Sequence, residues 1–278
     1  MSNLTIRILV AIVAIPLIVA ACYLGGPYFF LFTTALIVIS TNEFYALART
    51  KNIEPAAVLG ITSAGILNAI VYSNGINAAI DFLVVILVVV MLAELAKKRT
   101  DGVAGVFANI GTTITGIVYI GLFGAMLTAI RDRVGVERTF PTDREAGMFI
   151  IVIFATIWIC DSAAYFAGKS MGKHKMSKFV SPNKTWEGAI AGFVFAVAAA
   201  LAGRYLVLRE LDIRIALGTG IIVGTFGQAG DFVESLFKRD AGVKDSSTII
   251  PGHGGVLDRF DSLLFSAPLV YLLLKSLR

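Results

Sequence analysis

The sequence predicts an all-α integral membrane protein: about nine transmembrane helices in one bundle with a polar, cytoplasm-facing cavity. Of its 278 residues, 57% are hydrophobic and only 15% are charged, with a mean hydropathy of +0.82, far from the balance of a soluble domain. Apolar runs of about 20 residues, long enough to cross a bilayer, recur along the chain. They predict spans at 7–25, 28–48, 55–73, 77–96, 103–130, 147–168, 187–207, 213–236 and 262–277.

Short connections between these spans favour one compact membrane domain with two unequal halves. Residues 1–140, with the first five spans, are predicted to be scaffold helices, and residues 146–278 form the catalytic half. The first half carries three acids in or beside apolar spans, Glu43, Asp81 and Glu94. An ionisable group at membrane depth indicates function by default. Each acid is also explained as an interfacial residue or the partner of a nearby lysine, so their function stays open.

The two cysteines give no sign of a disulfide framework or a zinc site. Cys22 and Cys160 fall inside predicted spans and lie far apart in the sequence. Residues 19–22 resemble a lipoprotein cleavage box. A multispan protein needs only Arg7 and the apolar run for its first helix, so we interpret this segment as a transmembrane span.

The distribution of positive charge predicts the orientation in the membrane. The N-terminus and the loops after the second, fourth, sixth and eighth spans carry 15 of the 24 Lys and Arg residues. The side rich in Lys and Arg is the cytoplasmic one in most membrane proteins. We therefore expect a cytoplasmic N-terminus and an external C-terminus. The 15 are Arg7, Arg49, Lys51, Lys97, Lys98, Arg99, Lys169, Lys173, Lys175, Lys178, Lys184, Lys238, Arg239, Lys244 and Arg259.

The sixth span carries a polar stripe. Trp158, Asp161, Tyr165, Gly168 and Gly172 follow spacings of three and four, so they share one helical face. Small residues let membrane helices approach closely, which explains the glycines as a packing seam. The seam leaves Asp161 unexplained, because a buried acid needs a cation or donors nearby. We interpret Asp161 as functional.

A basic loop, "KHKMSKFVSPNKTWEGAIAG", precedes the seventh span. Ser181 and Pro182 predict a turn, and Thr185 is a candidate cap for a helix beginning near Trp186. Lys184 would then stand beside a helix N-terminus, which itself favours an anion. An ordinary positive loop touching lipid headgroups is the alternative, but the coincidence of these features favours phosphate binding.

Acids, a hydroxyl and a cation lie together at the end of the eighth span. Asp231, Glu234 and Lys238 are at i, i+3 and i+7, and Ser235 is the i+4 neighbour of Asp231. A helix end with Glu234 paired to Lys238 is the simpler interpretation. It leaves Asp231 unexplained, because this acid lies toward the apolar part of the span.

The segment "PGHGGVLDRFDS" follows, and its glycines predict non-helical backbone that can approach a ligand closely. Such backbone occurs at membrane depth only where it is buried in protein or lines a wet cavity. Asp258 and Asp261 at i, i+3 can share a helical face beyond it. We therefore expect a cavity here.

These residue types suit one kind of chemistry. Carboxylates without a Cys/His cluster favour a hard cation such as magnesium, and lysines and arginines favour phosphate. Together they suit phosphoryl or nucleotidyl transfer, with a lipid as one substrate because of the membrane. An ion-coupled secondary transporter is the alternative of another class. It predicts matching broken helices in both halves, whereas the polar motifs lie wholly in the second half.

The segment "SLFKRDAGVKDSSTIIPGHGGVLDRFDS" closely resembles the signature of the bacterial phosphatidate cytidylyltransferases, also called CDP-diacylglycerol synthases. The resemblance extends upstream to "WICDSAAYFAGKSMGKHK", to "SPNKTWEG" and to the Gly230-Asp231 pair, so it covers residues 158–262. One departure is Asn183, where family members commonly have a second lysine. The signature falls on Ser235, Lys238, Arg239, Lys244, Asp245, Pro251, Gly252, His253, Gly254, Gly255, Asp258, Arg259 and Asp261.

The resemblance implies a nucleotidyltransferase of phospholipid biosynthesis. The phosphate of phosphatidic acid would attack the α phosphorus of CTP, giving CDP-diacylglycerol and pyrophosphate. A CTP-dependent transferase or kinase acting on an isoprenoid-type lipid is the alternative. The implied partners are CTP, phosphatidic acid and the bilayer, with no nucleic acid, and the implied location is the bacterial inner membrane with the site facing the cytoplasm. The glycines of "GTGIIVG" also suggest a homodimer face, although packing within one chain would look the same.

The resemblance also implies residue roles. Asp231 and Asp258 would hold catalytic Mg²⁺, with room for a second cation, and Asp161 and Asp261 would be further ligands or supporting acids. His253 would donate to phosphate or be structural. The implied catalytic residues are Asp231, Asp258, Lys238, Arg239, Lys244, Arg259, Asp261 and His253. The implied substrate-binding residues are Lys184, Ser181, Asn183, Thr185, Ser235, Asp245, Gly254, Gly255 and Tyr165.

Overall fold

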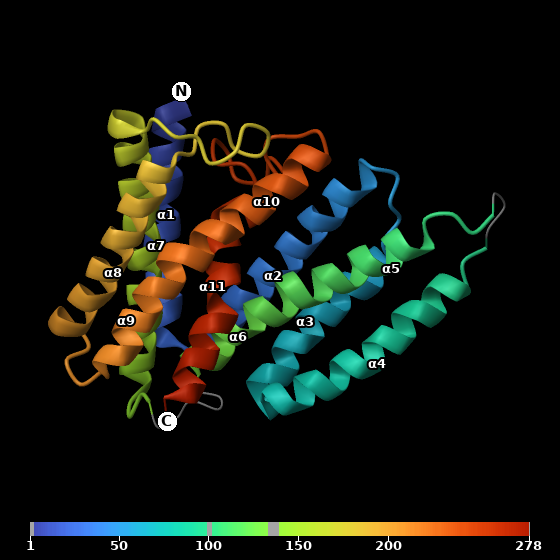
Figure 1. The fold of residues 1–278 in the computed structure, drawn as a ribbon. Helices are drawn as coiled ribbons and strands as arrows, with labels where there is room; N and C mark the ends of the chain where they lie inside the picture. The colour runs from blue at the N-terminus through green and yellow to red at the C-terminus, as the bar shows by residue number, and fades with distance from the viewer. Residues whose placement is uncertain (1–2, 99–101, 133–138, 278) are drawn as a thin grey trace.

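A computed structural model describes residues 3–98, 102–132 and 139–277, and all nine predicted spans are long helical segments in it (Figure 1). Two of the nine are divided internally by π-helical turns, η1 and η2. The segments are α1 (Asn3–Leu24), α2 (Gly26–Arg49), α3 (Ala57–Asn74), α4 (Ile76–Leu95), α5 (Val106–Thr115), η1 (Gly116–Leu122), α6 (Phe123–Arg131), α7 (Asp143–Met171), α8 (Trp186–Leu206), α9 (Ile213–Ile222), η2 (Val223–Gly227), α10 (Gln228–Asp240) and α11 (Leu257–Ser276).

The all-α membrane fold is confirmed for the described residues. They contain no β-strand, only two isolated bridges in loops. Seven of their helical segments are long and apolar enough to cross a membrane. The remaining two, α9–η2–α10 and α11, carry the acids and bases of the predicted site, which lowers their hydropathy.

The helices form two groups joined by the segments that carry the site. In Figure 1, α1, α7, α8 and α9 lie on one side and α3, α4 and α5 on the other, with α2, α10 and α11 between them. The N-terminus lies at one end of the bundle and the C-terminus at the other. An odd number of spans requires this arrangement.

Hydrogen bonds gather the predicted cytoplasmic segments at the N-terminal end. Arg7 Nε donates to the carbonyl of Gly252 at 2.7 Å, which ties the first helix to the loop between α10 and α11. The loop after α4 meets the loop after α2, where Lys97 Nζ donates to the carbonyl of Glu54 at 2.7 Å. Arg239 Nε donates to the carbonyl of Val180 at 3.2 Å, which adds the loop after α7.

The predicted grouping of these loops on one side is therefore confirmed for the described residues, and Arg99 lies outside them. That this side is cytoplasmic stays a prediction. Cys22 and Cys160 are buried free thiols, as expected from their place inside spans.

Glycines in the eighth span pack within the chain. A Cβ at Gly220 would lie 2.7 Å from Val197 Cα of α8, and one at Gly218 would lie 2.6 Å from Leu273 of α11. These positions are close approaches of neighbouring helices in the same molecule. The homodimer prediction therefore loses the support of this motif and stays a prediction.

The orientation can be tested with single cysteines at two exposed loop positions, because both native thiols are buried. Lys178→Cys lies between α7 and α8, and Arg209→Cys lies between α8 and α9, at the opposite end of the bundle. In intact cells a membrane-impermeant maleimide should label Arg209→Cys, and should label Lys178→Cys only after permeabilisation. The reverse pattern would show that the orientation is inverted.

Candidate active site

The start of α8 is built against α7 by small residues. The Oγ1 of Thr185 accepts from the backbone N–H of Gly188 at 3.2 Å, so the predicted cap of α8 is confirmed. Gly168 and Gly172 of the predicted stripe lie against this threonine. A Cβ at either would come within 3.1 Å or 2.7 Å of Thr185 Oγ1, respectively. The stripe is therefore, in part, a packing seam that sets the position of the loop before α8.

Lys184, the residue before that cap, reaches across to α10. Its Nζ lies 2.5 Å from Asp231 Oδ2 and 4.5 Å from the centre of the Phe232 ring. The other carboxylate oxygen of Asp231 faces Ser235 Oγ at 3.4 Å. Asp161 of α7 interacts electrostatically with both Lys184 and Asp231. The structure thus brings together charged residues from three separate sequence motifs.

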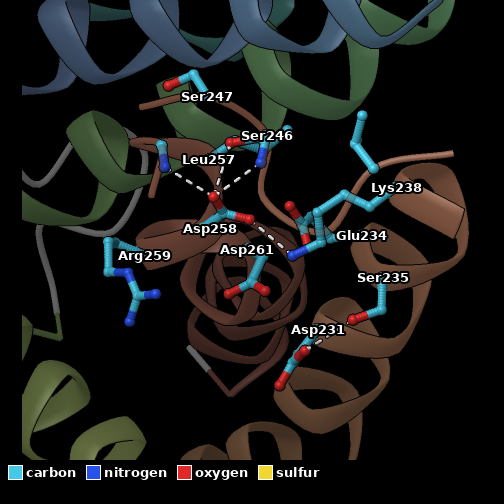
Figure 2. A network of polar contacts seen from close by, with 12 residues as sticks. Asp231, Glu234, Ser235, Lys238, Ser246, Ser247, Leu257, Asp258, Arg259 and Asp261 are labelled. Carbon is cyan, nitrogen blue, oxygen red and sulfur yellow. Dashed lines mark hydrogen bonds and ion pairs between the residues drawn. The ribbon is translucent and has the colours of Figure 1, made fainter. Parts of the chain in front are cut away.

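Asp258, at the start of α11, accepts from four donors (Figure 2). Its Oδ2 accepts from the backbone N–H of Ser246 at 2.9 Å, from Ser246 Oγ at 3.0 Å and from the N–H of Gly255 at 2.7 Å. Its Oδ1 lies 2.6 Å from Lys238 Nζ. Asp258 therefore closes the loop between α10 and α11 onto both helices.

Lys238 is buried between two acids, Glu234 of its own helix and Asp258. The Glu234–Lys238 pair that the spacing suggested is present, and Asp258 completes a three-residue cluster. Only 11% of the Lys238 side chain is exposed, and the Glu234 side chain is fully buried. This cluster fixes α10 to α11 through charge, and its burial makes each member depend on the others.

Asp261, one turn after Asp258, faces Asp231 across the space between α11 and α10 (Figure 2). It is buried, and it interacts electrostatically with Asp231, Asp161 and Lys238. Asp161, Asp231 and Asp258 are the three acids that were predicted first as metal ligands. Asp161 and Asp231 interact with each other, whereas Asp258 is bonded to Ser246, Gly255 and Lys238. Among the described residues no three His, Cys, Asp or Glu side chains come together as a metal-binding group.

Comparison with known proteins shows the family of the chain. The model of the cytidylyltransferase family matches residues 5–277. The chain belongs to that family. It is 34% identical to the phosphatidate cytidylyltransferase of Staphylococcus aureus over 97% of this chain and 98% of the relative. It is 33% identical to the protein of the same name from Staphylococcus haemolyticus and 32% identical to that from Staphylococcus epidermidis, with the same coverage.

Two arginines of this cytidylyltransferase hold loops through backbone carbonyls. Arg239 donates to Val180 and, at 3.0 Å, to Val243, so it joins the loop before α8 to the loop after α10. Arg259 Nε donates to the carbonyl of His253 at 2.9 Å, and its side chain is exposed beside Asp258 and Asp261 (Figure 2). Both arginines keep further N–H groups that can meet phosphate.

The remaining predicted residues lie at the edge of the cluster. The Nδ1 of His253 is buried and finds no hydrogen-bond partner in the described part of the chain, so its role stays open. Tyr165 is 61% exposed, with Lys169 Nζ 5.8 Å from its ring centre. Ser181 accepts from the N–H of Lys184 through its carbonyl at 3.1 Å and so shapes the turn. Asn183, Lys244 and Asp245 of the predicted set are exposed as well.

The predicted polar cavity does not coincide with either of two cavities that the described residues line. The larger, of about 330 Å³, lies on the far side of α10 from Asp231 and is mostly apolar. The smaller, of about 160 Å³, lies between the segment before α7 and the connection between α8 and α9. The polar cavity therefore stays a prediction. The larger cavity is lined by Phe44, Leu47, Ala48, Lys51, Ile53, Ala108, Gly111, Thr112, Thr115, Phe237, Asp240 and Ala241.

The acids of the first half have different surroundings. Glu94 pairs with Lys97 at 2.7 Å, so its interpretation as a lysine partner is confirmed, and Asp81 is exposed near the start of α4. Glu43 is only 1% exposed and accepts from Ser246 and Ser247 of the loop after α10. The sequence left the function of Glu43 open among scaffold helices, and the signal of a functional role was the presence of an ionisable residue in an apolar span.

Replacement of Asp258 by Asn tests the buried cluster. In either orientation, the NH₂ group of the amide would face a donor: Lys238 on one side, or Ser246 and Gly255 on the other. Glu234 would then be the one negative charge paired with the buried Lys238. We expect the free energy of unfolding to fall by about 3 kcal/mol, measured by unfolding in detergent micelles. Asp240→Asn is the matched control, because its 3.5 Å pair with Lys51 is exposed and should contribute less than about 1 kcal/mol. Equal losses in the two variants would contradict this account.

Proposed function

We propose that this cytidylyltransferase transfers the CMP moiety of CTP to phosphatidic acid and produces CDP-diacylglycerol and pyrophosphate. The observation that carries the proposal is the contact of Lys184 with Asp231, which joins the basic loop before α8 to the acids of α10 and α11. The two relatives from S. aureus and S. haemolyticus, which bear the name phosphatidate cytidylyltransferase, match nearly the whole chain. Acids and bases thus meet at the end of a membrane bundle, where a lipid phosphate and a nucleotide can meet.

The proposed reaction is an in-line substitution at the α phosphorus of CTP. An oxygen of the lipid phosphate forms the new P–O bond, and the bond to the β-phosphate oxygen breaks as pyrophosphate leaves. A phosphomonoester is already anionic at neutral pH, so the protein needs no Ser or Cys nucleophile. Its task is to position two anions and to stabilise the charge that develops between them.

Lys184, Lys244 and Arg259 are the cations that we propose for the phosphates. Lys184 is about one-third exposed, and the side chains of Lys244 and Arg259 are exposed. Lys184 can exchange its contact with Asp231 for a phosphate oxygen when substrate enters. The guanidinium of Arg259 matches the paired oxygens of a phosphate. Lys238 has two carboxylate partners, which supports a role in holding Asp258 rather than in clamping substrate.

The acids fit a hard divalent cation such as Mg²⁺ in chemical type. Mg²⁺ typically takes one or two carboxylates and completes its shell with water and substrate phosphates, so a cage of three protein ligands is not required. We propose Asp231 and Asp261 as its ligands, with Asp161 in the same electrostatic group. When bound, the cation would neutralise charge on the phosphates. Asp258 is assigned to the loop because its oxygens already have four donors.

We propose the inner membrane of a bacterium as the location, with the site on the cytoplasmic side. The supporting observations are the membrane-spanning helices, the bacterial relatives and the Lys and Arg residues gathered at the end of the bundle that carries the site. CTP would enter from the aqueous side and phosphatidic acid from the bilayer.

The direct test is turnover by purified protein in lipid vesicles with labelled CTP and Mg²⁺. We expect labelled CDP-diacylglycerol from phosphatidic acid, no product from an isoprenoid phosphate, and loss of product when the metal is chelated. If product forms from the isoprenoid phosphate and not from phosphatidic acid, the proposed lipid substrate is wrong. Turnover in the presence of a chelator would contradict the role of Mg²⁺.

Asp231→Asn and Asp261→Asn should each lower kcat by about 100-fold, because each removes a proposed ligand of the cation that would neutralise charge on the phosphates. Asp212→Asn is the matched control. Asp212 caps α9 on the opposite side of the bundle, and hydrogen bonds from Arg214 lower its pKa. Asn caps a helix as well as Asp does, so this control should keep full activity. Full activity in Asp231→Asn would refute its assignment.

A further inference from the structure

Glu43 lies near the end of α2, outside residues 158–262 that carry the signature of the site, yet four donors converge on its carboxylate. Ser246 Oγ and the backbone N–H of Leu257 donate to Oε2 at 3.1 Å and 2.7 Å. Ser247 Oγ and the N–H of Val256 donate to Oε1 at 2.6 Å and 3.0 Å. The donors lie 203 to 214 residues away in the sequence. One buried side chain therefore holds both ends of the loop between α10 and α11.

Two of these donors are the backbone N–H groups of Val256 and Leu257 at the start of α11. The first N–H groups of a helix have no partner inside it, and a carboxylate there also meets the positive end of the helix dipole. Val256, the residue before α11, provides no side-chain cap. Glu43 supplies that cap from another helix.

The pattern of donors requires a carboxylate. Each oxygen of Glu43 accepts from one backbone N–H and one hydroxyl. A hydroxyl can rotate to become an acceptor, whereas a backbone N–H is always a donor. A glutamine would place its NH₂ group against the N–H of either Val256 or Leu257, so one buried donor would lose its partner.

Ser246 connects Glu43 to the buried charge cluster. Its Oγ lies 3.1 Å from Glu43 and 3.0 Å from Asp258 Oδ2, and its N–H also donates to Asp258. Gly255 lies between the same two acids, where a Cβ would come within 2.7 Å of the Glu43 carboxylate. The two carboxylates thus enclose the loop tightly, and Gly255 is the residue that leaves room for them.

The helix that carries Glu43 is itself held in place. The adjacent Phe44 packs edge-on against Phe237 of α10, with ring centres 5.2 Å apart. The hydroxyl of Tyr45 donates to the carbonyl of Thr113 at 2.7 Å. Glu43 is therefore presented to the loop from a fixed position.

We propose that Glu43 is a positioning residue of the transferase site: it caps α11 and holds residues 246–257, which sets the direction of Arg259 and Asp261 toward the substrates. This inference rests on the proposed function. Glu43 itself acts through the loop, because its oxygens are buried and bonded to protein donors.

The test compares Glu43→Gln and Glu43→Asp with Glu94→Gln in purified protein in vesicles. Glu94 is a matched control: it is a buried acid of α4, it is 3% exposed, and it binds Asn109 and Lys97 far from the loop. Displacing reacting groups by about 1 Å can cost about 100-fold in rate. We expect Glu43→Gln to lower kcat by about that factor and to change KM for CTP less than about threefold. Glu94→Gln should keep kcat.

Two further readouts separate positioning from general stability. Hydrogen exchange at residues 246–257 should accelerate in Glu43→Gln and remain unchanged in Glu94→Gln, while both variants show similar melting temperatures. Glu43→Asp keeps a carboxylate that only accepts hydrogen bonds, on a shorter side chain, and should recover part of kcat, to within about tenfold of the wild type. If Glu43→Gln does not fold, the kcat of Glu43→Asp is used for the test instead.

Provided that the wild type makes CDP-diacylglycerol, full kcat in Glu43→Gln would overturn the inference. If Glu43→Gln does not fold, full kcat in Glu43→Asp would overturn it. Unchanged exchange in the loop would overturn it as well. If the wild type makes no CDP-diacylglycerol, the proposed function fails, and the exchange experiment still decides whether Glu43 holds the loop.

Discussion

Two buried carboxylates, Glu43 and Asp258, hold the loop that carries the most polar segment of the chain. A loop with free N–H groups and hydroxyls is costly to place at the end of a membrane bundle unless each donor has an acceptor. Glu43 and Asp258 provide these acceptors, and they share Ser246 between them. The arrangement of α2, α10 and α11 follows from this constraint, since each of the three helices contributes a charge or a cap to the same loop.

This constraint divides the acids of the site into two kinds. Glu43, Glu234 and Asp258 are occupied by protein donors or by Lys238. Asp161, Asp231 and Asp261 form an electrostatic group in which the only close cation contact is that of Lys184 with Asp231, as far as the described residues show. The acids of the second kind have negative charge that a divalent cation can use. The position of Asp258 in the first kind is the reason that we propose Asp231 and Asp261 as metal ligands, whereas the sequence suggested Asp231 and Asp258.

Much of this fold was predictable because the thickness of the membrane sets the length of each apolar run in the sequence. Runs of apolar residues located all nine helical segments, and the placement of Lys and Arg grouped the loops correctly. The cap at Thr185 and the Glu234–Lys238 pair were also predictable, because both depend on residues close in sequence. Family resemblance then gave the site motifs.

Contacts between distant residues could not be predicted in the same way. Glu43 meets a loop more than 200 residues later, and no local spacing encodes that distance. Asp258 and Asp231 are both acids in signature motifs, so the sequence alone could not tell which one serves the loop. Only the positions of Ser246, Gly255 and Lys238 in space distinguish them.

The most direct measurement is an experimental structure with CTP and Mn²⁺ in place of Mg²⁺, in which anomalous scattering locates the metal. The account predicts the metal beside Asp231 and Asp261, with Asp258 still bonded to Ser246, Gly255 and Lys238. A metal bound directly by Asp258, with those loop contacts broken, would contradict it.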